Sequence, residues 1–383
     1  MGEIEEYLKK RSEEGLLRKL RPISSRKAGI INVGGKEYID FSSNDYLGLS
    51  GHPRLIEAAR AALDEFGASS SASRLLSGDL AIHHRLEEET ARFKNKERAL
   101  VFNSGYQANV GILSSLYTVG DAIFSDRLNH ASIIDGMLLS GARIFRYSHN
   151  DPGHLDALLK RERRKFRKAL IVTETVFSMD GDRPPLKALV GLKEKHGCRI
   201  MVDEAHATGI YGKNGSGIVE EEGLSDEVDL IMGTFSKALG SFGAYVAASG
   251  EIVDYLINTC RSFIYSTGLP PAVTASNLAA LELVRREPHR RERLLGLAQY
   301  LRSALESMGL KVRGSSQIIP VITGENAKAE KFAEILRGLG YWALPIRPPT
   351  VPAKEARVRF SLTLHHDKDV LHKLLGDISH VKI

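Results

Sequence analysis

Asp203 and Lys237 are two residues whose type and placement suggest covalent chemistry. Asp203 and His206 stand in the motif MVDEAH, after the apolar run Arg199–Val202, and Lys237 stands in TFSKALG, after Leu230–Thr234. An acid at the end of a buried strand is costly unless it has a cationic partner. A lysine near such an acid is either an ordinary surface lysine or a desolvated lysine that bonds covalently to an aldehyde.

A third motif offers a site for an anion. The run Ala99–Phe102 is followed by NSGYQ (103–107), which opens a predicted helix. Small residues at a helix start leave backbone N–H groups at the positive end of the helix dipole, where a phosphate binds. Taken alone, the motif is more simply explained as an ordinary helix start.

Two further strand ends carry polar side chains. His130 follows the run Ala122–Phe124, and Ser178 lies in the oxygen-rich segment SMDGD after Ala169–Thr173. A lone histidine is more often structural, but a position at a strand end favours a functional role. A lysine, an acid and an anion site together are what pyridoxal phosphate requires for its aldehyde, its ring nitrogen and its phosphate. The residues therefore favour a pyridoxal-phosphate site.

The elements that must position these residues form an alternation of short apolar runs and helical stretches. The first six runs are separated by segments long enough for a crossover helix, whereas the last two are close together and predict a hairpin. The pattern predicts a mostly parallel, seven-stranded sheet covered by helices on both faces, with ligands at the carboxyl ends of the strands. The runs are Ala99–Phe102, Ala122–Phe124, Ile144–Tyr147, Ala169–Thr173, Arg199–Val202, Leu230–Thr234 and Ala244–Ala248.

The two ends of the chain differ from this pattern. A charged helix with leucines at positions 8, 16, 17 and 20 is predicted within residues 1–28, and a hairpin that turns at Gly34-Gly35 follows it. From about residue 285, helices and short strands predict a smaller α+β domain. We therefore expect an N-terminal arm (1–43), a large cofactor domain (44–284) and a small C-terminal domain (285–383) whose elements are Arg285–Met308, Gln317–Ile322, Ala327–Leu339 and Arg357–Leu362.

The composition excludes several classes of protein. The 383 residues are 43% hydrophobic, and 53 Lys+Arg face 47 Asp+Glu, for a net charge of +6. These values are typical of globular and not of disordered chains. The two cysteines, Cys198 and Cys260, form no CxxC motif, which argues against a disulfide scaffold and favours a cytoplasmic protein. The pairs His83-His84 and His365-His366 lack the i,i+4 spacing of a helical metal site, so no metal is expected.

The surplus of positive charge lies in one segment. Lys160–Lys168 (KRERRKFRK) has seven basic residues and one acid, which equals the whole surplus. Leu155, Leu158, Leu159 and Phe166 fall near helical spacing, so we interpret the segment as the solvated side of an amphipathic helix. A nucleic-acid patch is the alternative, but no motif supports it. No apolar run reaches the about 18 residues of a membrane span, and the acidic start of the chain is unlike a signal peptide. Neither a nucleic acid nor a membrane is therefore expected as a partner.

With these motifs the chain resembles the fold-type I pyridoxal-phosphate enzymes, specifically the α-oxoamine synthases, which join an amino acid to an acyl thioester with loss of CO2. The resemblance implies an α/β fold with a large cofactor domain and a smaller C-terminal α+β domain. It extends over nearly the whole chain, because further motifs follow in the family's order: FSSNDYLGLS (41–50), SGY (104–106), DRLNHAS (126–132), HNDPGHL (149–155), IYSTGLPP (264–271) and IRPPTVP (346–352).

The resemblance implies a role for each candidate residue at the cofactor. Lys237 matches the lysine that holds pyridoxal 5'-phosphate and later moves the Cα proton of the amino acid. Asp203 matches the partner of the pyridinium nitrogen, and His130 matches an imidazole that stacks on the ring and touches the substrate. The other cofactor contacts that it implies are Ser178 and His206 at the phenolic oxygen and Gly105, Tyr106 and Thr234 at the phosphate.

Substrate contacts are implied in the same way. Arg359, in ARVRFSLT, matches the arginine that binds the amino-acid carboxylate, and Thr350 matches a substrate contact. Arg18 aligns with an arginine that binds the acyl substrate, and Arg21 is its close rival for that role. A homodimer with shared active sites is also implied, because two residues resemble those that reach the phosphate of the partner subunit, Ser266 and Thr267.

Within the family, IRPPTVP and the shortened N-terminus most resemble the members that condense L-alanine with pimeloyl-CoA or a pimeloyl carrier protein in biotin biosynthesis. Which thioester is used stays open. Acyl-chain length also stays open, because Ser69–Ser73 replaces a stretch that is often glycine-rich. The alternatives are glycine C-acetyltransferase, serine palmitoyltransferase, 5-aminolevulinate synthase and a plain aminotransferase.

Overall fold

The computed structural model describes residues 2–381, which form two compact units. The small unit comprises the chain up to Gly48, the segment Met179–Asp182 and the chain from Glu292 onward; the large unit comprises Leu49–Ser178 and Arg183–Arg291. Residue 1 of the predicted arm and residues 382–383 of the predicted C-terminal domain lie outside the described residues.

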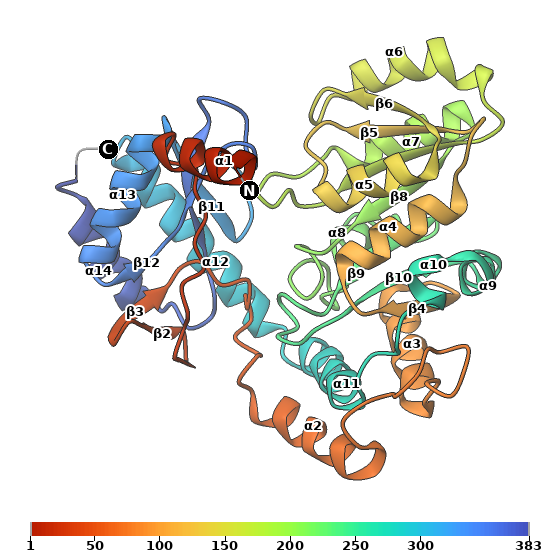
Figure 1. Cartoon of the computed structure of the whole chain (residues 1–383), viewed down its shortest axis with the longest axis horizontal. Coiled ribbons are helices and arrows are strands. Elements are labelled where there is room, and N and C mark those ends of the chain that lie inside the picture. Colours follow the sequence, from red (N-terminus) through yellow and green to blue (C-terminus); the bar gives the residue numbers. More distant parts are fainter. Residues whose placement is uncertain (1, 382–383) are drawn as a thin grey trace. The chain divides into compact units, whose positions relative to one another are not determined.

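A seven-stranded sheet forms the centre of the large unit (Figure 1). Its strand order is β4-β10-β9-β8-β7-β5-β6, and β10 is antiparallel to both of its neighbours while the other pairs are parallel. The predicted mostly parallel sheet and its terminal hairpin are thus confirmed. The strands are β4 (Arg98–Phe102), β5 (Ala122–Asp126), β6 (Arg143–Tyr147), β7 (Ala169–Glu174), β8 (Arg199–Asp203), β9 (Leu230–Thr234) and β10 (Ala244–Ala248).

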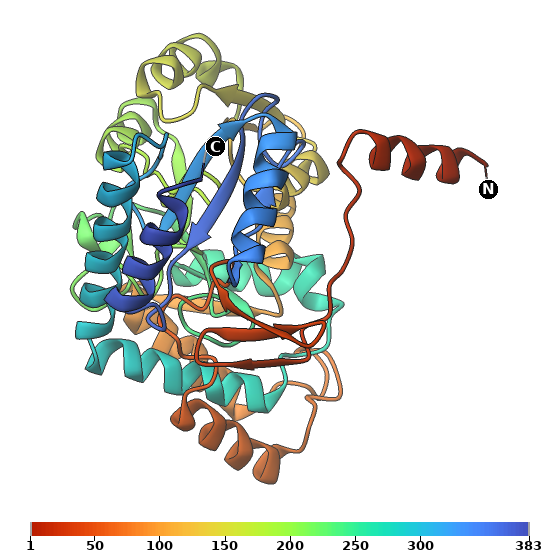
Figure 2. The same cartoon turned by 90° about the vertical axis from the view of Figure 1, so that its left-hand side faces the viewer.

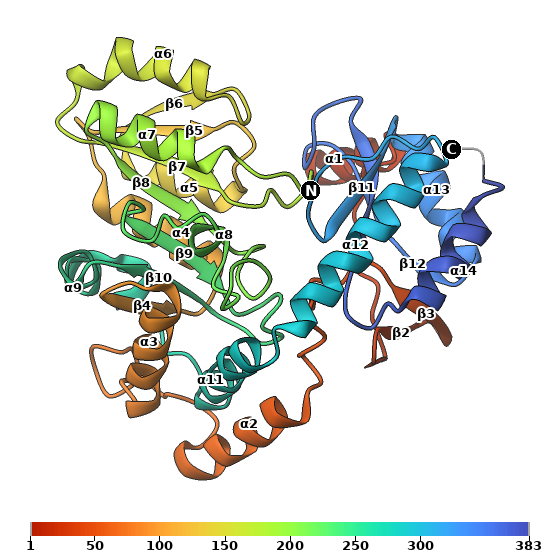
Figure 3. The same ribbon diagram turned by 180° about the vertical axis from the view of Figure 1, so that it is seen from behind.

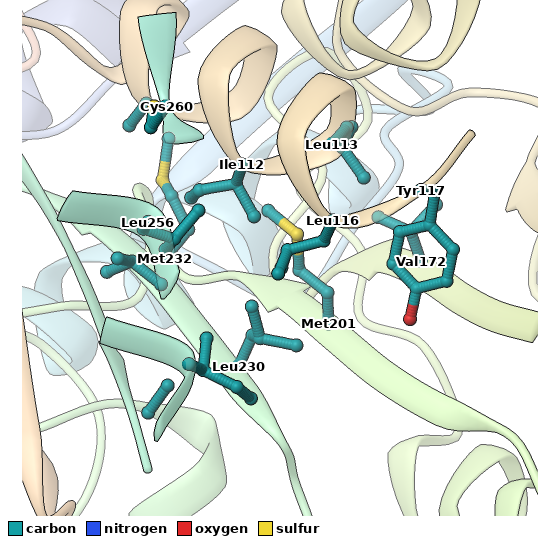
Figure 4. Close-up of a cluster of buried hydrophobic side chains, with 14 of the residues drawn as sticks. Ile112, Leu113, Leu116, Tyr117, Val172, Met201, Leu230, Met232, Leu256 and Cys260 are labelled. Carbon is teal, nitrogen blue, oxygen red and sulfur yellow. The ribbon is translucent and has the colours of Figure 1, made fainter. Parts of the chain in front are cut away.

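Helices cover both faces of this sheet, which is why its central strands are continuously apolar. Two of them, α4 (Gly105–Leu116) and α5 (Ala131–Ser140), lie on the face seen in Figure 1, and α7 (Leu186–His196) lies on the face seen from behind in Figure 3. The apolar side of α4 gathers with Met201 and Leu230 of the sheet in one buried cluster (Figure 4). The remaining helices are α2 (Pro53–Phe66), α3 (Ala81–Lys94), α6 (Pro152–Glu162), α8 (Ile218–Glu221), α9 (Gly250–Thr259), α10 (Arg261–Ile264) and α11 (Pro271–Arg286).

The small unit is built on two sheets. The first has the order β1-β2-β3-β12, and the predicted hairpin is its β2–β3 pair, in which Gly34 and Gly35 turn with φ of 61° and 81°. The second has the order β11-β14-β13. The elements of this unit, with α12 reaching into it, are β1 (Ser25–Lys27), β2 (Ile30–Val33), β3 (Lys36–Asp40), α12 (His289–Ser307), β11 (Ile318–Gly324), α13 (Asn326–Gly338), β12 (Tyr341–Trp342), β13 (Pro345–Ile346), β14 (Ala356–Ser361) and α14 (Lys368–Ile378).

The predicted arm and the predicted C-terminal domain contribute to this same unit. They are joined because β3 pairs with β12 in parallel, with Ile39 opposite Tyr341 and Asp40 opposite Trp342. Four residues from the middle of the chain, Met179–Asp182, also belong to it, because Arg357 of β14 binds the carboxylate of Asp180 at 2.7 Å.

Two helix predictions were wrong in extent. The N-terminal helix α1 spans only Gly2–Glu13, because Gly15 turns the chain with φ of 64°, so Leu16, Leu17 and Leu20 lie outside it. None of its residues is buried, and Figure 2 shows it projecting from the rest of the small unit.

The basic segment Lys160–Lys168 is likewise not one helix. Helix α6 ends at Glu162, a short 3₁₀ turn (Arg163–Lys165) follows, and Phe166 packs against Phe145 with ring centroids 5.7 Å apart. The apolar residues at helical spacing that lie on α6, Leu155, Leu158 and Leu159, are buried. None of the helices in residues 2–381 combines the length and the apolarity that crossing a lipid bilayer requires.

Candidate active site

Candidate residues follow four adjacent strands of the large unit. Strands β5, β7, β8 and β9 are neighbours and run parallel, so their carboxyl ends share one edge of the sheet. Asp203 and Thr234 are the last residues of β8 and β9, and Lys237, His130 and Ser178 follow within a few residues of a strand end. The charges of Lys237 and Asp203 both act on the His130 imidazole, so the structure brings these three groups together.

The start of α4 forms the predicted anion site. Ser104 is its N-cap and accepts from the backbone N–H of Gln107 at 3.2 Å. Within residues 2–381 this leaves the backbone N–H groups of Gly105 and Tyr106, the first two residues of the helix, without an intrahelical acceptor. A Cβ at Gly105 would stand 3.1 Å from Met232 Cε, so glycine keeps this approach open. The arrangement suits a phosphate.

Asp203 accepts two hydrogen bonds in a buried position. Its side chain is almost completely buried, and it accepts from Asn109 Nδ2 and from the backbone N–H of Ala205, both at 2.9 Å. Asn109 lies in none of the motifs that the sequence indicated. It stands four residues after Gly105 and thus one turn along the same helix face, a spacing that could have revealed it.

His130 is the N-cap of α5. Its Nδ1 lies 2.8 Å from Ser132 Oγ and accepts from the Ser132 backbone N–H at 3.3 Å. Although part of the residue is exposed, desolvation of the ring lowers the pKa of His130, the positive charge of Lys237 lowers it further, and Asp203 offsets part of this effect. The imidazole is therefore neutral at pH 7.

Glu174 is a second buried acid that the sequence analysis missed. It ends β7 directly opposite Asp203 of β8. Burial raises the pKa of Glu174 well above its ordinary value, and the negative charge of Asp203 raises it further while Lys237 offsets part of the shift. A strongly shifted pKa of this kind is common for acids in active sites. The visible signal was a glutamate at the end of a buried apolar run.

The turn that carries Lys237 is fixed from within. The Thr234 hydroxyl donates to the carbonyl oxygen of Gly243 at 2.7 Å and accepts from the Ser236 backbone N–H at 3.1 Å. Lys237 itself is half-buried, and His206 is almost completely buried after β8.

Ser266 and Thr267 lie beside the start of α4 of their own chain. Ser266 Oγ accepts from Gln107 Nε2 at 2.7 Å, and the carbonyl oxygen of Thr267 accepts from Asn103 Nδ2 at 3.0 Å. These contacts hold the two residues at the edge of the candidate phosphate site.

Apart from His130, the predicted substrate residues belong to the small unit. Arg359 lies on β14, where its Nη2 donates to Asn44 Oδ1 at 3.1 Å and to Tyr46 Oη at 3.3 Å. Its Nε is buried and has no hydrogen-bond partner among the described residues. A half-buried guanidinium with a buried, unused donor is suited to an anion such as a carboxylate.

The structure separates the two rival arginines. Arg18 Nη2 donates to Thr350 Oγ1 at 3.0 Å, and both residues line a hollow of about 250 Å³ together with Arg347. Arg21 instead lies over the ring of Trp342, 5.7 Å from its centroid. Arg18, and not Arg21, therefore shares a hollow with Thr350. Within residues 2–381 no group of three or more His, Cys, Asp or Glu side chains is placed to hold a metal ion.

The chain matches known proteins along almost its whole length. Residues 36–378 match the family model described as aminotransferase class I and II. The 8-amino-7-oxononanoate synthases of Geobacter sulfurreducens and Geotalea daltonii are 49% and 48% identical to it, over 96% of this chain and 95% and 94% of theirs.

Solved structures agree with this match. A serine palmitoyltransferase of S. paucimobilis superposes with a TM-score of 0.93 at 31% identity, over 98% of this chain and 96% of that one. The 8-amino-7-oxononanoate synthase of Francisella tularensis gives 0.77 at 31% identity, over 89% and 97%. The predicted resemblance and the predicted fold class are confirmed: the chain belongs to the aminotransferase class I and II family and, within it, to the group of the 8-amino-7-oxononanoate synthases.

Proposed function

We propose that this chain condenses L-alanine with a pimeloyl thioester, giving 8-amino-7-oxononanoate, CO2 and the free thiol of CoA or of a carrier protein. The observation that carries the proposal is the identity of 49% to an 8-amino-7-oxononanoate synthase over 96% of this chain. The candidate residues that follow β5, β7, β8 and β9 at one edge of the sheet support the proposal. It is a step of biotin biosynthesis.

Pyridoxal 5'-phosphate is the cofactor, and the large unit fits it. The amides at the start of α4 suit its phosphate, and the buried Asp203 suits a protonated ring nitrogen. When bound, the cofactor withdraws electrons from the Cα of the amino acid through its protonated ring. The residues that we assign to it are Gly105, Tyr106 and Thr234 at the phosphate, Ser178 and His206 at the phenolic oxygen, Asp203 at the ring nitrogen and Lys237 at the aldehyde.

The residues of the chain move and hold the protons. We assign Lys237 Nζ to removal of the alanine Cα proton and to its return after CO2 is lost. Proton transfer by a positioned group contributes about 10²–10⁴-fold to a rate. Asn109 and the Ala205 amide donate to the two oxygens of Asp203 and fix its orientation.

We assign the substrate contacts to the small unit and to His130. The unused Nε donor of Arg359 is suited to the alanine carboxylate. Arg18 and Thr350 are assigned to the acyl substrate, which the hollow that they share supports. His130, as a neutral ring, stacks on the cofactor and contacts the substrate.

A panel of substrates tests the proposal. The purified holoenzyme receives L-alanine, glycine or L-serine with pimeloyl-CoA, pimeloyl carrier protein, acetyl-CoA, succinyl-CoA or palmitoyl-CoA, and both thiol and CO2 release are measured. L-alanine with a pimeloyl thioester should give the highest kcat/KM. A preference for glycine, or conversion of alanine to pyruvate without an acyl donor, would contradict it.

The covalent role of Lys237 has its own test. Borohydride reduction of the wild-type holoenzyme should attach the cofactor to the peptide that contains Lys237, as mass spectrometry can show. Lys237→Ala should bind the cofactor without this attachment. Equal labelling of both proteins would overturn the assignment.

Serine palmitoyltransferase activity is the second candidate. The observation in its favour is the TM-score of 0.93 to the S. paucimobilis serine palmitoyltransferase. The 31% identity of that match is far below the 49% of the first. L-serine with palmitoyl-CoA in the panel decides between the two.

We further propose a cytoplasmic homodimer with shared active sites. Two observations support it: Leu138 and Leu139 of α5 are exposed apolar side chains of the kind that subunit interfaces bury, and both cysteines are free. Ser266 and Thr267 are assigned to the partner subunit's phosphate. Sedimentation equilibrium should give twice the mass of one chain, and a monomer that is fully active would contradict the proposal.

A further inference from the structure

We infer that Asn109 and Ser132 are positioning residues that link Asp203 to His130 and keep the proton of the neutral imidazole on Nε2. The inference rests on the proposed function only in giving His130 a role at the substrate. The hydrogen bonds themselves belong to the large unit and join α4, α5 and the end of β8.

The direction of each hydrogen bond follows from Asp203. A carboxylate only accepts, so the amide atom of Asn109 that lies 2.9 Å from Asp203 Oδ2 must be the donor Nδ2. The second hydrogen of Nδ2 then points to Ser132 Oγ, also at 2.9 Å. A reversed amide would place Asn109 Oδ1 against the carboxylate and is excluded by charge.

The hydrogen bonds between Ser132 and His130 have a defined direction as well. Because Ser132 Oγ accepts from Asn109, its own hydrogen is available to His130 Nδ1 at 2.8 Å. The backbone N–H of Ser132 also points to Nδ1, at 3.3 Å, and an amide N–H can only donate. Nδ1 is therefore an acceptor from both groups, which leaves the proton of the neutral ring on Nε2.

The chain of bonds is shielded from water over most of its length. Asn109 and Ser132 are 1% and 0% exposed, and Asp203 is 6% exposed. In such surroundings an unmade hydrogen bond is costly, so the arrangement is strongly determined. Protonation of Nδ1 would aim two donors at each other and break the arrangement.

The charged groups around the His130 ring also favour its neutral form. Asp203 and Asp135 raise the pKa of His130, whereas ring desolvation and Lys237 lower it, and the net direction is downward. The other acid nearby, Glu174, interacts with the backbone of His130 and is itself driven towards its neutral form. The ring therefore presents Nε2–H as a donor, and the substrate contact that we propose for His130 would be an oxygen atom.

Nuclear magnetic resonance of the holoenzyme tests the tautomer directly. In protein labelled with ¹⁵N-histidine at pH 7.5, the His130 signals are identified by their loss in His130→Gln. We expect a protonated Nε2 and an unprotonated Nδ1. A proton on Nδ1, or on both nitrogens, would overturn the inference.

Variants test the two positioning residues. Ser132→Ala should give a mixture of tautomers, shift the acid limb of the kcat profile and lower kcat about tenfold, the factor carried by an ordinary hydrogen bond. Ser132→Thr keeps the hydroxyl and should restore the wild-type spectrum. Asn109→Ala should mix the tautomers as Ser132→Ala does, since the Ser132 hydroxyl is then free to turn.

Ser140→Ala is the matched control. Ser140 is a buried serine on the same helix whose hydroxyl donates to the Met137 carbonyl oxygen at 2.6 Å, away from His130. It should leave the tautomer and the pH profile unchanged. If Ser132→Ala behaves like Ser140→Ala in both, the inference fails. The spectra require no substrate, so a different result from the substrate panel would overturn the proposed reaction and not this inference.

Discussion

At the scale of single residues, the acids that end β7 and β8 show how surroundings decide charge. Asp203 receives two hydrogen-bond donors, whereas burial and the negative charge of Asp203 opposite it raise the pKa of Glu174. The sequence predicted Asp203 because its motif is distinctive. Glu174 was missed because its effect depends on the register between two strands, which a sequence does not display.

Replacing Glu174 with a neutral side chain of the same size should therefore have little effect on kcat/KM. Glu174→Gln keeps the size and the neutrality of the side chain, so kcat/KM should stay within about threefold of wild type, less than 1 kcal/mol. Asp203→Asn should lower it by about 10²-fold or more, because the charge is lost where it is needed. Steady-state kinetics and cofactor absorbance of both variants check this. Equal losses in the two would show that Glu174 is ionised.

Arg359 allows a prediction about the amino acid. Arg359→Lys removes the planar donor pair, including the buried Nε, so the KM for L-alanine should rise at least about tenfold. The assay varies L-alanine at a saturating pimeloyl thioester. The KM for the thioester and the melting temperature should stay as in wild type. An unchanged KM for L-alanine would remove Arg359 from the carboxylate site.

At the scale of elements, the strands were predictable and the helix ends were not. Fully buried strands read as continuous apolar runs, and all seven runs of the large unit are strands of its sheet. Helix α1 was predicted too long because the leucines at 16, 17 and 20 were assigned to it, whereas the chain turns at Gly15. Asn109 and Ser132 escaped prediction because the bond between them joins two helices, a contact that local spacing does not reveal.

The start of α4 gives a prediction of its own. Ser104→Ala removes the acceptor of the Gln107 amide, a change that costs about 1 kcal/mol and should lower the melting temperature by about 2–4 °C. It should also weaken cofactor binding, because the first turn that carries the anion site loosens. Differential scanning calorimetry and a cofactor titration measure the two effects. Ser104→Thr keeps the cap and serves as control; a similar loss in that variant would rule out the cap as the cause.

At the scale of the whole molecule, the residues that we assign to cofactor and substrate are distributed over the two compact units. The residues assigned to the cofactor lie in the large unit, whereas Arg18, Thr350 and Arg359 lie in the small unit. The motifs of the sequence predicted these residues as parts of one active site. The sequence did not predict that the arm belongs with the C-terminal region. The β3–β12 pairing that joins them is short, and the two strands are far apart in the sequence.

The stability of the small unit should depend on pH through His366. This side chain is fully buried, its ring stacks on Phe41 with centroids 4.1 Å apart, and its Nδ1 accepts from the Thr363 backbone N–H at 3.1 Å. Burial lowers the pKa of His366 from 6.5 to about 3. Between these values the unfolded chain binds a proton that the folded chain does not, so acid favours unfolding.

The free energy of unfolding should therefore fall by about 1.4 kcal/mol for each pH unit below about 6.5, through this residue alone. Urea titrations at pH 7, 6, 5 and 4 measure this for wild type and for His366→Gln. The variant should be less stable at pH 7 but should lose less stability on acidification. Parallel curves for the two proteins would show that another group controls the acid response.

The pairing of β3 with β12 also decides when the small unit can be completed during synthesis. β3 leaves the ribosome early, whereas Tyr341 and Trp342 are translated near the end. At about 5–20 residues per second the hairpin waits on the order of tens of seconds with one edge unpaired. Such an edge is a template for aggregation, and chaperones protect nascent chains at this stage. The sheet that begins with β1, β2 and β3 is thus completed only after β12 has been translated.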